Sequence, residues 1–546
     1  MVVSSATRFL PEKGQPARLL ALALLFLAPL AFGFLAIGLG QDANWDLRNY
    51  HFYNAYAFLN DRYAMDLLPS QTPYFYNPLM DVPFFVLATS VPAKVAGFAL
   101  GFVQGLNFIL LFIMAHAVLV VPKPLHKVVV CAALSALGML GGGGIAQIGT
   151  TFGDNMTSLG VFLSAALVLR YIENLSTDAV AKAFRYALIF GLPVGLMTGL
   201  KLPAAIYAVG LCGGLLFVGK DLRRGFALSF AFGLGALIGC AVTLGPWAVF
   251  LQAHFGSPLF PYFNDFFGSP LAPPTSARDM QYAPHSWSDY FLIPFIFAKT
   301  AYRVGEIELR DWRIPILYVL LPAAFVLRLL LNRRSADRRD FTAPDKAKYL
   351  LIGFALAYVA WLVMFSIYRY AVTLEMMTPL LILLAVGLLP IGVKKRAVIA
   401  ACLLVVVALS VQPGNWTRRE AWLDLFVEAQ VPDLGDTSNL MILMAGMEPY
   451  SHVIPEFPPE ISFVRIQSNF SSPEEDKGIN KLLHERVDAH RKKGGRFMML
   501  VPLWQVSAAE DAAAYFGLKV ASKECKQVTD KLFNDSPLSL CPVVSQ

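Results

Sequence analysis

The residues best suited to chemistry gather in the first polar connector of the chain, directly after an apolar stretch that ends near Gly40. Asp42 and Asp46 open this connector and stand four residues apart, so on a helix they would share one face. A carboxylate at a membrane surface can act as a general base or bind a polar head group. We therefore predict that Asp46 and Asp42 are catalytic. The alternative is that both belong to a solvated loop start.

Further polar side chains near these carboxylates are candidates for binding a substrate. The candidates are Arg48, Asn49, His51 and Asp81, together with Asp154 at the end of a later apolar stretch. His51 suits a catalytic role because its ordinary pKa lies near neutral pH, and it equally suits a structural hydrogen bond. Both interpretations of His51 remain open from the sequence.

Cations also interrupt the apolar stretches. Lys201 stands between two apolar segments, and Arg369 lies within Tyr368-Arg369-Tyr370, in a very short connector. Ionisable groups at such depth are costly and tend to line a site. Arginine offers a planar fork of donors to phosphate, and lysine offers a point charge. We predict that Arg369, Lys201 and Tyr368 bind a phosphate; the alternative is that the cations pair with acidic side chains to hold helices together.

These residues must be positioned by a membrane-embedded scaffold. Hydrophobic residues make up 56% of the chain and charged residues only 15%, which is well below the share in soluble domains. The net charge of +7 comes mostly from short connectors between apolar segments, so it does not indicate nucleic-acid binding. Composition therefore predicts a polytopic α-helical membrane protein.

A membrane span needs about 20 apolar residues, and on that rule the sequence predicts about eleven transmembrane helices. They lie near 18–40, 94–121, 128–147, 155–171, 185–200, 202–219, 225–251, 312–331, 349–366, 377–393 and 397–412. Two shorter apolar pieces, Val82 to Val91 and Tyr290 to Ala301, are expected to be interfacial or re-entrant helices. The Gly141–Gly144 run lacks the Lys-Ser/Thr ending of a phosphate loop, so it favours a helix break or close helix packing.

Basic residues recur in every second connector, which predicts an orientation by the positive-inside rule. The basic positions are Arg8, Lys13, Arg18, Lys123, Lys127, Lys182, Arg185, Lys220, Arg223, Arg224, Arg328, Arg333, Arg334, Arg338, Arg339, Lys346, Lys348, Lys394, Lys395 and Arg396. The N-terminus is then cytoplasmic, and the connectors 41–93 and 252–311 lie on the outer side together with the tail. Residues 1–412 are expected to form the transmembrane domain.

The tail, 413–546, has ordinary polarity and is expected to form a periplasmic α/β domain. Strands are predicted at Asn439 to Ala445, Ile461 to Ile466 and Phe497 to Val501, with helices at Lys477 to Lys493 and Ser507 to Phe516. Cys525 and Cys541 lie in this tail and are expected to pair as a disulfide if it faces an oxidising compartment. The other four cysteines lie in apolar segments, where small hydrophobic residues are common.

Taken together, these features resemble the GT-C superfamily of membrane glycosyltransferases, in the bacterial group that includes lipid A aminoarabinose transferase and protein O-mannosyltransferases. The resemblance rests on one N-terminal span, an acidic outer connector, many spans and an outer domain. Three short motifs add to it: Thr198-Gly199-Leu200-Lys201, Gly256-Ser257-Pro258-Leu259-Phe260-Pro261 and Tyr368-Arg369-Tyr370. Ser257 stands where that group usually carries Asn, and Asp42 and Asp46 stand where it carries an Asp-Glu pair.

The resemblance implies transfer of a sugar from a polyprenyl-phosphate donor to a lipid, glycan or protein acceptor on the periplasmic face of a bacterial inner membrane. The phosphate ester is itself the activated donor, so no cofactor is required. A divalent metal is optional in this scheme, because fixed cations already balance the phosphate, and the sequence does not indicate a metal site. Membrane lipids are the other expected partners.

Two other classes of function are open from the sequence. A transporter or flippase of a lipid-linked sugar would place charges near the bilayer midplane and would show two related halves. The polar positions instead lie toward one surface, and no duplicated pattern is evident. A non-catalytic assembly subunit that presents the tail to a partner is the third class.

Overall fold

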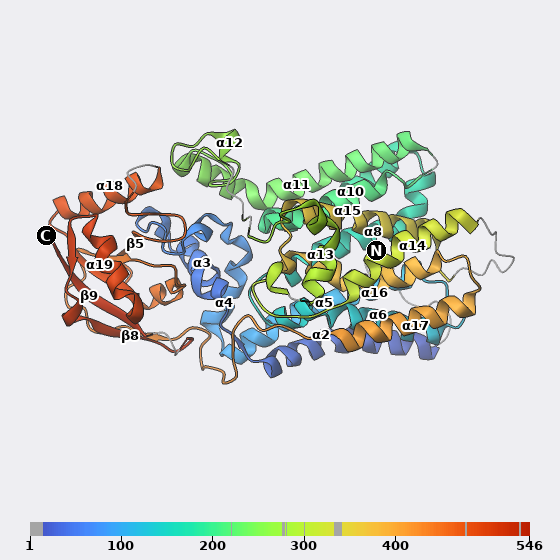
Figure 1. Cartoon of the computed structure of the whole chain (residues 1–546), viewed down its shortest axis with the longest axis horizontal. Coiled ribbons are helices and arrows are strands. Elements are labelled where there is room, and N and C mark those ends of the chain that lie inside the picture. Colours follow the sequence, from blue (N-terminus) through green and yellow to red (C-terminus); the bar gives the residue numbers. More distant parts are fainter. Residues whose placement is uncertain are drawn as a thin grey trace.

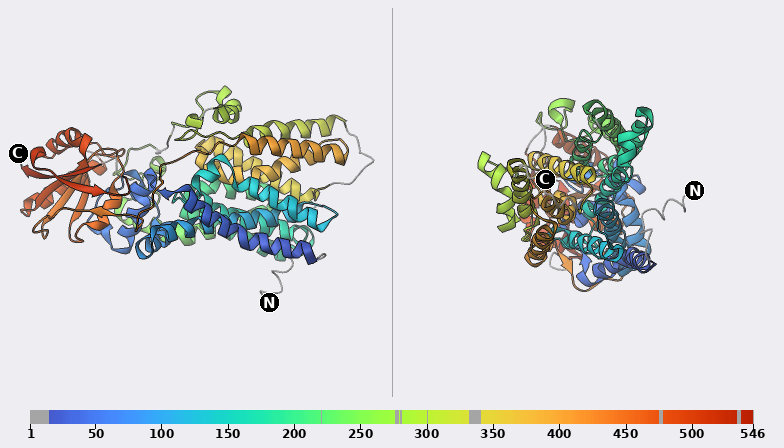
Figure 2. Two further views of the ribbon diagram at one scale, coloured as in Figure 1. Left: turned by 90° about the horizontal axis from the view of Figure 1, so that it is seen from below. Right: turned by 90° about the vertical axis from the view of Figure 1, so that its right-hand side faces the viewer.

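The computed structural model describes residues 15–219, 221–275, 279, 281–299, 301–331, 341–474, 478–533 and 537–545. The molecule is elongated, with a helix bundle at one end and a sheet domain at the other (Figure 1; Figure 2). Several positions used in the sequence predictions lie outside the described residues: Arg8, Lys13, Lys220, Arg333, Arg334, Arg338, Arg339 and Lys477.

The bundle contains one helix for each of the eleven predicted apolar segments. These helices are α2 (Gln15–Leu39), α5 (Ala93–Val118), α6 (Pro124–Met139), α8 (Asp154–Thr177), α9 (Val180–Leu200), α10 (Ala205–Leu215), α11 (Leu222–Phe255), α14 (Arg313–Leu331), α15 (Pro344–Met364), α16 (Val372–Gly387) and α17 (Val393–Ser410). Within the described residues, eight helical segments are long and apolar enough to cross a membrane. Helices α6 and α10 are shorter, and α17 carries three basic residues, Lys394, Lys395 and Arg396, in its first turn. Eleven spans therefore remain a prediction, whereas eleven helices are found.

Small residues allow these helices to pack closely. Gly195 of α9 and Gly235 of α11 lie against the opposite backbone: a Cβ atom added at Gly195 would lie 2.1 Å from the Ala236 carbonyl oxygen, and one at Gly235 would lie 1.9 Å from that of Leu188. Helix packing through small residues is typical of apolar surroundings, where van der Waals contact replaces the hydrophobic effect.

The basic connectors meet at one end of the bundle, which we call the basic end. The backbone amide of Val120 donates to the carbonyl oxygen of Phe341 (2.8 Å), which joins two of these connectors. Thr342 lies against Gly387 at the end of α16. On the other side of the bundle, Arg224 donates to the carbonyl of Asp178 (2.6 Å). The sheet domain lies at the opposite end (Figure 1). This segregation is the geometry that the alternation of basic connectors predicts.

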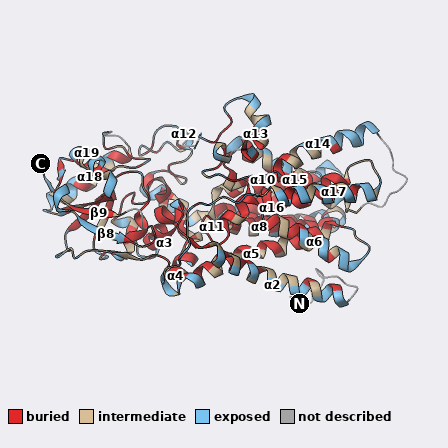
Figure 3. Cartoon of the chain, turned by 60° about the horizontal axis from the view of Figure 1, so that its bottom comes forward, coloured by how far each residue is buried: buried red, intermediate tan, exposed pale blue. Residues whose placement is uncertain are grey.

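The 41–93 connector folds into short elements between the bundle and the sheet domain. They are β1 (Gln41–Asp42), the π-helical turn η2 (Leu47–His51), α3 (Phe52–Leu59), η3 (Arg62–Ala64), η4 (Thr72–Phe75), η5 (Pro78–Met80) and α4 (Val82–Ser90). Most residues from Gln41 to Ala57 are buried, as the colouring of α3 in Figure 3 shows. The solvated loop start offered as the alternative for Asp42 and Asp46 is therefore wrong, because the sheet domain covers this segment.

Shorter helices lie in the connectors between the long helices. They are α7 (Gly142–Gln147), η6 (Leu202–Ala204), α12 (Asn264–Phe267), α13 (Trp287–Lys299), η7 (Ala301–Arg303) and η8 (Tyr368–Ala371). Helices α4 and α13 coincide with the two apolar pieces for which extra helices were predicted. The helix breaks between α6 and α7, just before Gly142, and glycine is needed at Gly141 for space, because a Cβ atom added there would lie 2.0 Å from Oε1 of Glu375.

The sheet domain combines parallel and antiparallel strands. Its elements are β2 (Arg418–Arg419), β3 (Ala429–Gln430), β4 (Leu440–Met444), η9 (Ser451–Glu456), β5 (Ser462–Arg465), α18 (Ile479–Lys492), β6 (Arg496–Pro502), η10 (Leu503–Gln505), α19 (Val506–Ala514), β7 (Leu518–Val520), η11 (Ser522–Glu524), β8 (Lys526–Asp530) and β9 (Leu538–Ser545). The main sheet has the order β3-β8-β9-β6-β4-β5, and β7 also pairs with β9.

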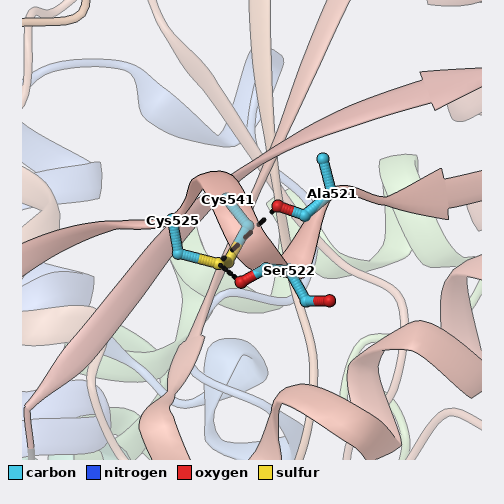
Figure 4. The surroundings of a disulfide bond; sticks show 4 residues. All are labelled: Ala521, Ser522, Cys525 and Cys541. Atoms are coloured by element: carbon cyan, nitrogen blue, oxygen red, sulfur yellow. Dashed lines mark hydrogen bonds between the residues drawn. A yellow bond between two sulfur atoms is a disulfide. The ribbon is translucent and has the colours of Figure 1, made fainter.

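The parallel strands β5, β4 and β6 and the helices α18 and α19 match the predicted elements of the tail. The antiparallel strands β7, β8 and β9 were not predicted. A disulfide between Cys525 and Cys541 joins the segment before β8 to β9 (Figure 4).

Hydrogen bonds tie the sheet domain to the 41–93 connector. Strand β1 pairs with β2, and Leu67 bridges to Val464 of β5. The guanidinium of Arg465, which is fully buried, donates to the Pro69 carbonyl (2.8 Å). The connector is therefore held from both sides, and its polar side chains take fixed directions.

Candidate active site at the end of the bundle

An ion pair between Asp46 and Arg369 forms the centre of the candidate site. Arg369 Nη1 donates to Asp46 Oδ2 (2.5 Å), and Arg369 Nη2 lies 3.2 Å from Oε1 of Glu306. The hydroxyl of Tyr50 also donates to Asp46 Oδ2 (3.1 Å). Asp46 comes from the start of η2 and Arg369 from η8, so residues more than 300 positions apart meet here.

A second ion pair lies beside the first. Lys201, at the break between α9 and η6, approaches Oδ1 of Asp154 to 2.8 Å and donates to the carbonyl of Phe152. Asp154 begins α8, directly after Gly153, whose φ of +81° suits glycine. The ring of Phe152 lies 5.0 Å from the guanidinium carbon of Arg369, which is a cation–π distance. The short segment from Phe152 to Asp154 therefore contacts both cations, Lys201 and Arg369.

A third pair joins His51 and Asp81. His51 Nδ1 lies 2.7 Å from Asp81 Oδ1, and both side chains are buried. The imidazole ring of His51 lies against the ring of Tyr50 (4.1 Å between centroids), the same tyrosine that bonds Asp46. We call the whole group the outer charge cluster; it comprises Asp46, His51, Asp81, Asp154, Lys201, Glu306 and Arg369.

The charges in this cluster act on one another. Burial raises the pKa of the Asp46 carboxyl, but the charges of Arg369, His51 and Lys201 lower it by more, so the pKa lies below its ordinary value. Burial raises the pKa of Asp81, partly offset by His51. Asp46 is therefore the carboxyl held most firmly as the anion.

Glu306 completes the cluster from the 252–311 connector. Burial raises its pKa, and the charge of Arg369 offsets part of that rise. Its Oε2 accepts from Trp416 Nε1 (3.0 Å), and its side chain is 32% exposed. Glu306 gives the cluster its contact with solvent.

Three buried polar atoms of the cluster have no hydrogen-bond partner within the described residues: His51 Nε2, Asp154 Oδ2 and Arg369 Nε. Leaving a buried polar atom unpaired costs about 1–3 kcal/mol. Such atoms are rare in native proteins and often mark the place of an absent ligand or water. The cluster thus offers an acceptor (Asp154 Oδ2), a donor (Arg369 Nε) and a ring nitrogen (His51 Nε2) to a ligand or a water molecule.

Asp42 lies outside the cluster. It belongs to β1, and its two oxygens accept hydrogen bonds from Asn44 and from the amide and hydroxyl of Thr151 (2.7–3.0 Å). The predicted shared helix face with Asp46 is wrong, because the chain is extended at 41–42 and turns helical only afterwards. Burial raises the pKa of Asp42 against the opposing charge of Arg418. Asp42 therefore fixes the connector to the bundle.

Arg48 and Asn49 also point away from the cluster. The guanidinium of Arg48 stacks over Phe533 of the sheet domain (3.7 Å), and Arg48 Nε donates to the Ala43 carbonyl (3.0 Å). Asn49 Nδ2 donates to the Ser70 carbonyl (3.1 Å). Both were predicted to contact the substrate beside Asp46, and their directions were hidden by the π-helical turn.

Tyr368 belongs to a different group, although it adjoins Arg369 in sequence. Its hydroxyl donates to Oε2 of Glu375 (2.6 Å), and the amides of Gly143 and Gly144 donate to the same carboxylate (3.0 and 2.7 Å). Arg313 and Asp311 complete this group through a 2.9 Å ion pair. We call it the glycine cradle; it comprises Gly142, Gly143, Gly144, Asp311, Arg313, Tyr368 and Glu375.

Of the predicted site residues, the structure therefore brings together Asp46, His51, Asp81, Asp154, Lys201 and Arg369. It places Asp42, Arg48, Asn49 and Tyr368 elsewhere. The sequence analysis did not identify Glu306, Phe152, Tyr50 and Trp416 as part of the site.

Glu306 could have been found as an acidic residue near the end of a predicted outer connector. Within the described residues, no group of three or more His, Cys, Asp and Glu side chains could hold a metal ion.

No family model and no curated protein matches this chain. The outer charge cluster and its geometry are therefore the basis for a functional assignment.

Proposed function

We propose that this chain is a membrane glycosyltransferase of the GT-C type, which moves a sugar from a polyprenyl-phosphate donor to a lipid, glycan or protein acceptor. The observation that carries the proposal is the outer charge cluster. It combines a carboxylate of lowered pKa, two cations and three buried polar atoms that lack a hydrogen-bond partner within the described part of the chain, all at one end of an apolar bundle. A lipid-linked phosphosugar needs these groups at this place.

Arg369 and Lys201 bind the donor phosphate in this proposal. Arg369 carries five N–H groups, and its Nε has no partner within the described residues. Lys201 carries three N–H groups, of which two are directed at Asp154 and Phe152. The remaining donors have no hydrogen-bond partner in the part of the chain that the structure describes, so they can hold phosphate oxygens and stabilise the phosphate as it leaves.

Asp46 accepts the proton of the acceptor hydroxyl. Arg369 and Tyr50 both bond Oδ2, which leaves Oδ1 for that hydroxyl. A carboxylate of lowered pKa is a weak base, but a bound phosphate draws the charge of Arg369 toward itself. The pKa of Asp46 then rises toward the working pH, which makes the base more effective. Donor binding thereby prepares the base.

The bonds change in one displacement. The acceptor oxygen attacks the anomeric carbon, the bond from that carbon to the phosphate oxygen breaks, and the hydroxyl proton passes to Asp46. The polyprenyl phosphate leaves with the electron pair. The reaction needs no redox partner, and the chain's own cations balance the leaving group.

The orientation of the chain follows the positive-inside rule. The basic end of the bundle faces the cytoplasm in this proposal, together with the N-terminus. The outer charge cluster and the sheet domain then face the periplasm of a bacterial cell, where a disulfide such as Cys525–Cys541 persists.

Transfer of radiolabelled sugar from polyprenyl phosphate by the full chain in nanodiscs tests the proposal. Asp46→Asn and Arg369→Met should each lower kcat/KM by about 100- to 10,000-fold, the usual contribution of a base or of a charge-stabilising donor. Asp289→Asn and Arg303→Gln are the matched controls, because these residues form another outer ion pair (3.5 Å). Unchanged transfer in both cluster variants would remove the mechanism.

A further inference from the structure

The arginine at the centre of the outer charge cluster faces two carboxylates. Arg369 Nη1 donates to Asp46 Oδ2 (2.5 Å), and Arg369 Nη2 lies 3.2 Å from Oε1 of Glu306. The neighbouring cation, Lys201, is paired with Asp154 (2.8 Å). The single positive charge of Arg369 is therefore already shared by two negative ones. Because like charges in one site repel, a phosphate can be held at Arg369 only if one of these two carboxylates gives up its contact.

Asp46 is the carboxylate that is held more firmly. Its contact with Arg369 is the shorter of the two, and its side chain is only 11% exposed. The hydroxyl of Tyr50 donates to the same oxygen, Oδ2 (3.1 Å). Moving Asp46 would break two hydrogen bonds of a side chain that water hardly reaches, and burying or stranding a charge in that way is costly.

Glu306 is the carboxylate that can leave. Its side chain is 32% exposed, so it can turn into water without crossing the packed part of the cluster. Its other oxygen, Oε2, accepts from Trp416 Nε1 (3.0 Å), which is a single neutral hydrogen bond. Ion pairs that water reaches contribute little to stability, because solvent screens them and because ordering a long side chain costs entropy. Releasing Arg369 from Glu306 is therefore the cheaper of the two changes.

The backbone around Glu306 is fixed, so the movement is confined to its side chain. The carbonyl of Val304 accepts from the amide of Tyr368 (2.5 Å), two residues before Glu306. Arg310 exchanges two backbone hydrogen bonds with Gln412 (3.0 and 2.8 Å), four residues after it. A side chain that turns between two anchored positions needs no rearrangement of the 252–311 connector.

We propose that Glu306 occupies the position of the donor phosphate on Arg369 and is displaced when that phosphate binds. The inference rests on the function proposed above, since the phosphate is that of the lipid-linked sugar. A phosphate oxygen takes the N–H of Arg369 Nη2, and the Glu306 carboxylate turns to solvent. A phosphodiester with one negative charge then replaces one carboxylate, so the net charge around Arg369 stays the same.

Lipid binding by the full chain in a non-ionic detergent, which carries no phosphate, tests this exchange. The probe is polyprenyl methyl phosphate, a diester with one negative charge, and polyprenol is the uncharged reference. Glu306→Gln removes the competing charge and should bind the phosphate lipid about tenfold or more tighter, with polyprenol binding unchanged. Asp289→Asn is the matched control, because Asp289 is an acid of the same connector that pairs with Arg303 (3.5 Å); it should bind as the wild type does.

A double substitution shows whether the gain passes through Arg369. In Arg369→Met, adding Glu306→Gln should give no further gain, because the two side chains then have no interaction to lose. A gain that persists in Arg369→Met would overturn the inference, since Glu306 would then act on the lipid by another route. Equal or weaker binding of the phosphate lipid by Glu306→Gln would overturn it too, as would an equal gain for polyprenol or in Asp289→Asn.

The outcomes separate this inference from the proposed function. If Glu306→Gln binds no tighter while Asp46→Asn and Arg369→Met abolish sugar transfer, the exchange is rejected and the proposed function stands. If Glu306→Gln binds tighter through Arg369 but the chain transfers no sugar, the exchange stands and the transfer is rejected.

Discussion

Two groups of buried charges lie in one bundle and differ in how their hydrogen bonds are met. In the glycine cradle, the Glu375 carboxylate accepts from two backbone amides and a tyrosine hydroxyl. Arg313 bonds Asp311 and the carbonyls of Leu137, Gly138, Leu140 and Glu375. In the outer charge cluster, three buried atoms lack a partner within the described residues.

The difference separates a structural group from a binding site. Both groups contain an arginine between two carboxylates, and both come from segments far apart in the chain. The buried polar side-chain atoms of the cradle all find hydrogen-bond partners among the described residues. The cluster retains unpaired donors and acceptors, and Glu306 brings it to solvent. Buried polar atoms without a hydrogen-bond partner, more than buried charges as such, indicate the binding site.

Replacing the arginine of each group should give the largest contrast in stability. Arg313→Met leaves Asp311 and Glu375 buried without a countercharge and should cost about 3–5 kcal/mol. Arg369→Met should cost clearly less, because Asp46 keeps Tyr50 and Lys201 nearby and Glu306 reaches solvent. Thermal unfolding in one detergent measures the stability of both variants. Unfolding is monitored by a thiol-reactive dye that labels the buried Cys131 only when it becomes exposed.

An equal loss of stability in the two arginine variants would contradict this comparison. The outer charge cluster would then be a structural brace, which is the alternative that the sequence left open for its cations. Asp289→Asn again serves as the control for a change of charge on the outer surface.

The two carboxylates at the start of the 41–93 connector offer a finer contrast. Asp42 accepts five hydrogen bonds from Asn44 and Thr151, so Asp42→Asn places an amide donor against other donors and should cost about 1–3 kcal/mol. Asp46→Asn should leave stability nearly unchanged, since it removes one carboxylate from a group with more acids than bases. Thermal unfolding of the two variants under identical conditions shows which substitution lowers stability more. A less stable Asp46→Asn than Asp42→Asn would refute the division between anchor and site.

The sequence predicted the helices well because one strong signal governs them. Apolar stretches long enough for a helix stand out against their polar connectors, and each of the eleven predicted segments is helical. The same signal placed Asp46, Lys201 and Arg369 at one end of the bundle. Because all three residues lie at the same end of the bundle, their meeting in one cluster could be expected. Their positions along the sequence do not by themselves predict that contact.

Side-chain direction was beyond the sequence because it depends on local backbone geometry. Asp46 faces Arg369 and Arg48 faces the sheet domain, because residues two apart on a helical turn point to opposite sides. Arg369 and Tyr368 likewise diverge within the short η8. The strands β8 and β9 were missed because their sequence patterns are mixed, and they are stabilised by pairing: β9 pairs with β6, and β8 pairs with β9.

The smallest expected effect is a shift in pH dependence, which tests how Arg369 acts on Asp46. The pKa of Asp46 lies below its ordinary value of 3.8, so the base is ionised above that pH and is lost only as the pH falls through the lowered pKa. In Arg369→Gln the lowering charge is absent and the burial of the carboxyl remains. The acid limb of kcat/KM should therefore move to higher pH, by about one unit for each 1.4 kcal/mol of lost interaction. Sugar transfer measured from about pH 3.5 to pH 8 should show little of the wild-type acid limb and should bring the limb of Arg369→Gln into view. Arg418→Gln is the control, because Arg418 acts on Asp42 and should leave the limb in place. An acid limb that stays fixed in Arg369→Gln would mean that Asp46 is not the base whose ionisation controls transfer.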